Sequence, residues 1–137
     1  MKLTKAQQMH IEDIWKNYKE YKNKKDFRYW VVVEKPKKDN NIGGGRSSNI
    51  SDTTAQRVID LSKDMQYQYL KSIVGAVEYV YNSLDDYTKE IVSCRYWNEF
   101  GVLEWADMKD EFNISRSKAF RIREIIINKT AKKLGWL

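Results

Sequence analysis

The residues best suited to chemistry lie near the end of this 137-residue chain. Ser115, a residue type that caps helices, is followed by Arg116, Lys118 and Arg121. Arg and Lys on the first turns of a helix can donate to guanine acceptors in the major groove of DNA or to phosphates. A capped helix start also offers free N–H groups that hold phosphate. This pattern predicts a nucleic-acid-binding surface.

The distribution of charge favours the same ligand. Residues 114–137 contain seven Lys or Arg and one Glu, residues 39–113 contain seven basic and thirteen acidic residues, and residues 1–38 contain eleven basic and five acidic residues. A basic tail that is separate from an acidic middle creates the local positive field that attracts a polyanion. The same charges could also serve only to keep a surface helix in solution.

Three short helical patterns surround the basic residues. We expect helices over residues 85–97, around residues 102–108 and over residues 116–134, with Gly135 as the stop signal. This spacing is typical of a helix-turn-helix. We expect Ala106, Ile114, Ala119, Ile122 and Ile126 to face its core. The predicted DNA-contacting surface then consists of Ser115, Arg116, Ser117, Lys118, Phe120, Arg121 and Arg123.

The rest of the chain predicts elements that position this unit. Apolar residues at helical spacing indicate an N-terminal helix over residues 3–25, and the β-branched and aromatic run Phe27 to Val33 indicates an extended apolar segment. Residues 34–50, with the only Pro and Gly43-Gly44-Gly45, predict a flexible linker that lets the N-terminal helix move. Ser51 or Asp52 is expected to cap one long central helix, which continues to about Asn82.

That central helix carries an apolar stripe near heptad spacing, made of Val58, Met65, Tyr69, Ile73, Val77 and Val80. Such a stripe needs a partner, either the N-terminal helix or a second copy of the chain. The predicted fold is therefore all-α in four segments. These are an N-terminal helix and apolar segment (1–33), the linker (34–50), the long helix (51–83) and a helix-turn-helix domain (84–137).

Two known groups resemble these segments. Residues 84–134 resemble region 4 of sigma factors, with Ile114-Ser115-Arg116-Ser117-Lys118 at the turn and the start of the recognition helix. The whole chain resembles the RinA family of phage-encoded activators of late transcription, through the run from Asn41 to Asn49 followed by Thr54-Ala55-Gln56. The C-terminal helices alone resemble ArpU-type relatives equally well. The resemblance implies sequence-specific binding to a phage promoter, with Phe120 in place of a usual polar residue.

No catalytic or metal-binding constellation is evident, so we expect neither an enzyme nor a cofactor. His10 is the only histidine, Cys94 the only cysteine, and Asp85-Asp86 suits a helix start. Gly43-Gly44-Gly45 lacks the Lys-Ser/Thr of a phosphate loop. A single cysteine and the absence of a long apolar run indicate a protein of the reducing cytoplasm of a bacterial host, without membrane contact.

Three functions follow from these features. The first is a DNA-binding transcription activator, with double-stranded DNA as the main partner, RNA polymerase as a further partner and a homodimer on a repeated site. The second is a small terminase-like DNA-packaging subunit. The third is an adaptor whose aromatic N-terminal half binds RNA polymerase or a host protein, with the basic helix incidental.

Overall fold

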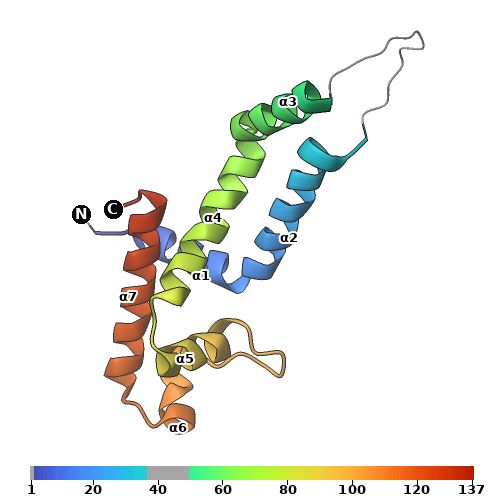
Figure 1. Cartoon of the computed structure of the whole chain (residues 1–137). Coiled ribbons are helices and arrows are strands. Elements are labelled where there is room, and N and C mark those ends of the chain that lie inside the picture. Colours follow the sequence, from blue (N-terminus) through green and yellow to red (C-terminus); the bar gives the residue numbers. More distant parts are fainter. Residues whose placement is uncertain (1, 37–49) are drawn as a thin grey trace.

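The protein is all-helical throughout the part that the computed structural model describes, residues 2–36 and 50–137 (Figure 1). No strand occurs in these two ranges. The elements are α1 (Lys5–Lys16), α2 (Tyr18–Tyr29), the π-helical turn η1 (Trp30–Glu34), α3 (Ile50–Lys63), α4 (Met65–Asn82), α5 (Asp86–Tyr96), the 3₁₀ turn η2 (Trp105–Asp107), α6 (Met108–Phe112) and α7 (Arg116–Leu134).

The N-terminal helix predicted over residues 3–25 is two helices that meet at Asn17. Thr4 begins α1 with a capping box, in which its hydroxyl accepts from the Gln7 backbone and the Gln7 side chain accepts from the Thr4 backbone. At the junction the Asn17 side chain donates to the Asp13 carbonyl oxygen at 3.0 Å. A short polar side chain that bonds to the local backbone competes with helical hydrogen bonding, which explains a break at this residue.

The segment Phe27 to Val33, which the sequence predicts to be extended, is helical. It completes α2 and forms η1, which closes with a bond from the Lys35 N–H to the Trp30 carbonyl oxygen at 2.7 Å. Val31 to Val33 are half-buried, and η1 lies against α3. The β propensity of this run is overridden because the described residues provide no strand to pair with, whereas α3 provides a helical surface.

The predicted central helix is also two helices, separated at Asp64. The Asp64 carboxylate caps α4 by accepting from the Tyr67 N–H at 2.8 Å. It also accepts two bonds from Arg28 of α2, at 2.9 and 2.6 Å, and this guanidinium lowers the pKa of the carboxyl. These bonds hold α2 against the start of α4. Helices α2 and α3 and the start of α4 extend away from the rest of the molecule (Figure 1).

One hydrophobic core joins the two ends of the chain. Ile11, Ile14 and Trp15 of α1 are buried in the same cluster as Ile73, Val77 and Val80 of α4 and the inner faces of α5 and α7. The Trp15 indole donates to the Thr130 hydroxyl of α7 at 3.0 Å, with both groups buried. Helix α1 is thus an integral part of the C-terminal unit. The expectation that it moves relative to the rest does not fit this packing.

The apolar stripe predicted on the central helix divides inside α4, between Tyr69 and Ile73. Ile73, Val77 and Val80 lie in the core, whereas Val58, Met65 and Tyr69 are 56, 86 and 56 % exposed. Of the predicted linker, only residues 34–36 and 50 lie inside the described part of the chain, and the side chains of Ser51 and Asp52, the expected caps, lie outside it. None of the described helices combines the length and the apolar content needed to cross a membrane.

Gly75, an exposed residue inside α4, gives a stability prediction. A Cβ at this position would meet no atom within 4 Å, so Gly75→Ala should raise the free energy of unfolding by about 1 kcal/mol through helix propensity. Urea denaturation measures this change. Gly135→Ala is the control of opposite sign, because its φ of +82° strains any L side chain. A neutral or destabilising Gly75→Ala would show that something covers this face.

Candidate nucleic-acid interface

The turn that precedes α7 is built by three consecutive residues. Asn113 ends α6 in the left-handed conformation with a φ of 52°, a position that Asn tolerates. Ile114 is then buried, at 6 % exposure, and Ser115 caps α7 by accepting from the Lys118 N–H at 3.1 Å. The predicted cap, turn and start of the basic helix are confirmed. Gly135 ends α7, also as predicted, and the following Trp136 N–H donates back to Ala131.

The inner face of α7 packs on α4, η2, α1 and α6. Ala119, Ile122 and Ile126 are buried, as the sequence predicts. The expectation for Ala106 is wrong, because Ala106 is exposed. Trp105 and Met108 fill the position beside α7 instead, at 3 and 0 % exposure. A large aromatic side chain rather than a small residue therefore sets the spacing between η2 and α7.

Most of the predicted contact residues are exposed. Ser115, Arg116, Ser117, Lys118, Phe120 and Arg121 are all exposed on the first two turns of α7, and we call these six residues the basic face. The Arg116 guanidinium lies over the Phe120 ring, 5.4 Å from its centroid. Within the described residues, no carboxylate lies within ion-pairing distance of Arg116, Lys118 or Arg121. These cations are therefore available to an external anion.

Arg123 differs from the other predicted residues. It is half-buried, and its Nε donates to the Glu12 carboxylate of α1 at 2.9 Å. Arg123 therefore connects α7 to α1 and is not part of the basic face. The last residue of the basic face along α7 is therefore Arg121.

Glu12 has a structural role that the sequence does not reveal. One of its oxygens, Oε1, accepts from the Tyr96 hydroxyl at 3.1 Å, the Trp105 indole at 2.9 Å and Arg123. These three donors belong to α5, η2 and α7. Burial and the nearby Glu12 carboxylate raise the pKa of Tyr96, so its hydroxyl keeps the proton that it donates. A single carboxylate on α1 thus connects α5, η2 and α7.

Arg95 adds a second charge to this cluster. Its side chain is 4 % exposed, and its guanidinium lies over the Tyr96 and Trp105 rings. It approaches Glu104 at 3.4 Å and Glu12 at 3.9 Å. The buried cation therefore reinforces the position of Trp105 beneath α7.

Acidic groups border the basic face on the α5 side. Asp85 caps α5, and its pKa is lowered mainly by its bonds to Thr88, with a smaller contribution from the positive charge of Lys118. Asp110 and Glu111 occupy the short helix α6. Carboxylates of α5 and α6 therefore lie on the elements next to the basic face at the start of α7.

The other candidate reactive groups have structural partners. His10 packs edge-on against Trp136, with ring centroids 5.4 Å apart. Cys94 is half-buried, and burial together with nearby Glu111 and Glu90 raises the pKa of its thiol. In residues 2–36 and 50–137 there is no group of three or more His, Cys, Asp or Glu residues that could hold a metal ion.

The cap of α7 can be tested by stability alone. Ser115→Ala should lower the free energy of unfolding by about 1 kcal/mol, because the Lys118 N–H loses its acceptor. Ser117→Ala, two residues further on and also exposed, is the matched control and should change little. Equal effects of the two changes in urea denaturation would contradict the assignment of Ser115 as the cap.

Comparison with known proteins gives a single positive finding. Residues 28–132, about three quarters of the chain, match the model of a family described as a protein of unknown function (DUF722). Searches of curated proteins and of solved structures give no match.

Proposed function

Since the chain belongs to the DUF722 family, whose description gives no activity, we propose from the geometry of α7 that it is a sequence-specific double-stranded DNA-binding protein. The observation that carries the proposal is the basic face. Arg116, Lys118 and Arg121 project from the first two turns of a capped helix whose opposite side is buried. A helix that is exposed in this way is the element that most often enters the major groove of DNA.

Each group on the basic face has a role in this proposal. Arg116 and Arg121 donate to guanine edges, and Lys118 neutralises a phosphate. The Ser115 hydroxyl is already used as the cap, so the free N–H groups of the first turn bind a second phosphate. Phe120, 39 % exposed, contacts a thymine methyl group. Its contact with Arg116 orients that guanidinium before DNA arrives.

We further propose that the biological role is activation of late transcription of a phage in its bacterial host. The resemblance to RinA proteins and to sigma region 4 supports this role, and it makes RNA polymerase a natural second partner. One chain carries one basic face, so two copies on a repeated site would double the contact with DNA. A small terminase-like subunit would use the same face but assemble into a ring of many copies.

A protein-interaction adaptor is the second candidate function. Exposed apolar side chains on α2, α3 and the start of α4, which together we call the extension, favour it, with Phe27 at 63 %, Met65 at 86 % and Val58 at 56 % exposure. Exposed apolar groups in this number commonly mark a protein contact. The two functions are compatible in one activator, but only the first requires the basic face.

The dependence of DNA affinity on salt tests the proposal. If the two phosphates contacted by Lys118 and the first-turn N–H groups are neutralised, the logarithm of the association constant should fall with the logarithm of the salt concentration with a slope of about −2. Fluorescence anisotropy of a labelled duplex measures this slope. An absence of binding at low salt, or an association constant that does not change with salt concentration, would contradict the proposal and favour the adaptor function.

A further inference from the structure

A loop between α5 and η2 presents an unusually exposed aromatic side chain. Phe100 is 97 % exposed at the tip of residues 97–104, and Val102 close by is 47 % exposed. In Figure 1 this loop extends sideways from the lower part of the molecule, beyond the end of α5. A Phe side chain in this position loses the whole benefit of burial.

The loop is nevertheless held in a fixed shape. At its base the Leu103 N–H donates to the Cys94 carbonyl oxygen at 3.1 Å, and the Trp97 indole donates to the Trp15 carbonyl oxygen at 2.6 Å. At its tip the Asn98 side chain accepts from the Phe100 N–H at 3.0 Å. Gly101 completes the turn with a φ of +121°. Phe100 is thus held in position before a partner binds, which lowers the entropy cost of inserting it into that partner.

The charges of the loop indicate what kind of surface it fits. Glu99 is exposed beside Phe100, and Glu104 at the end of the loop is 66 % exposed. Two carboxylates disfavour a DNA backbone. They suit an apolar groove whose edges carry positive charge.

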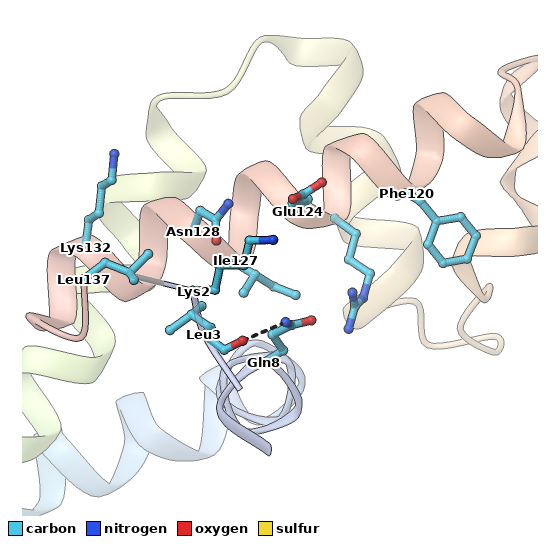
Figure 2. A pocket seen from close by; sticks show the side chains of 10 residues that line it. Lys2, Leu3, Gln8, Phe120, Glu124, Ile127, Asn128, Lys132 and Leu137 are labelled. Atoms are coloured by element: carbon cyan, nitrogen blue, oxygen red, sulfur yellow. Dashed lines mark hydrogen bonds between the residues drawn. The ribbon is translucent and has the colours of Figure 1, made fainter. Parts of the chain in front are cut away.

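The chain itself contains a groove with mixed apolar and charged walls, between the N-terminal stretch and α7 (Figure 2). Its volume is about 650 Å³. Leu3, Ile127 and Leu137 provide apolar walls, and Lys132 and Phe120 lie at opposite ends of the groove (Figure 2). Lys2, Arg123 and Glu124 also line it. Within the described residues, neither lysine has an ion-pair partner.

We infer that the Phe100 loop of one copy inserts into the α1/α7 groove of a second copy of this chain. Phe100 would occupy the apolar part of the groove, and Glu99 would approach Lys132 or Lys2. A chain does not fill its own groove, because no residue of the loop lines it, and the loop and α7 lie on opposite sides of α5 in Figure 1. The contact is heterologous, so copies add head to tail.

Sedimentation velocity of the full chain, without DNA, tests this inference independently of the proposed function. The average mass of the wild type should rise above the 16.3 kDa of one chain as concentration increases. Phe100→Ser should weaken this association at least about thirtyfold, as expected for an aromatic side chain at the centre of a contact. Phe27→Ser is the matched control, because Phe27 is also exposed but lies on α2. It should associate as the wild type does.

A charge exchange identifies the two surfaces. Glu99→Lys and Lys132→Glu should each weaken self-association, and the variant with both changes in one chain should associate again, because the changed loop then meets the changed groove. The inference is overturned if the wild type stays monomeric at every concentration, or if Phe100→Ser associates as tightly as the wild type. Association that is lost in Phe27→Ser but kept in Phe100→Ser would overturn it as well, and would place the contact on the extension.

Discussion

Replacing Arg116 and Arg121 together by Ala should weaken duplex binding by about a hundredfold or more. Each guanidinium is exposed and available to make a two-bond contact with a guanine, and such a contact contributes roughly 1–3 kcal/mol. Neither side chain supports the core, so circular dichroism should show unchanged helix content. Anisotropy titrations of the variant and the wild type, at the same salt concentration, measure the loss.

Net charge alone would also lower affinity, so this experiment needs a control of equal charge. Lys22→Ala with Lys24→Ala removes two exposed cations from α2, far from α7. This pair should lose much less affinity than the α7 pair. Equal losses would mean that DNA responds to the overall charge of the protein, and the proposed basic face would have no special role.

Glu12→Ala should lower the free energy of unfolding by about 3 kcal/mol. The change leaves Tyr96, Trp105 and Arg123 without their shared acceptor, and it deprives Arg95 of one of its two nearby carboxylates. Breaking a largely buried charged network typically has a cost of this size. Denaturant unfolding measures the change, and DNA affinity should fall with it because α7 loses its ion pair with α1.

Two variants separate this network from a general effect of removing a carboxylate. Glu12→Gln keeps an acceptor oxygen at the same length, so it should recover part of the lost stability. Glu90→Ala removes an exposed carboxylate from α5 and should have little effect. If Glu12→Ala were as stable as the wild type, this residue would not couple α1 to α5, η2 and α7.

The parts of the fold that follow from local chemistry could be predicted from the sequence. The bounds of α7 depend on Ser115 at one end and Gly135 at the other, and both act within one turn of their own position. The exposure of the basic face follows from the apolar spacing of Ala119, Ile122 and Ile126 on the other side of the helix. The break at Asp64 had a signal too, since Asp is a common cap, but an uninterrupted apolar stripe concealed it.

The features that depend on distant contacts could not be predicted in this way. In the sequence, Glu12 looks like any other polar residue on a surface helix, because its hydrogen-bond partners are 84, 93 and 111 positions away. Arg123 reads as a member of the basic face for the same reason. The run Phe27 to Val33 favours a strand by composition, yet its surroundings are helical. In each case tertiary context decides what the local pattern leaves open.

Selection of bound duplexes from a random pool tests the central claim most directly. If the first two turns of α7 enter the major groove, the wild-type protein should enrich one short sequence. The Arg121→Ala variant should enrich the same sequence with the preference relaxed at one base position. A pool that stays random, or a variant with an unchanged preference at every position, would contradict the account.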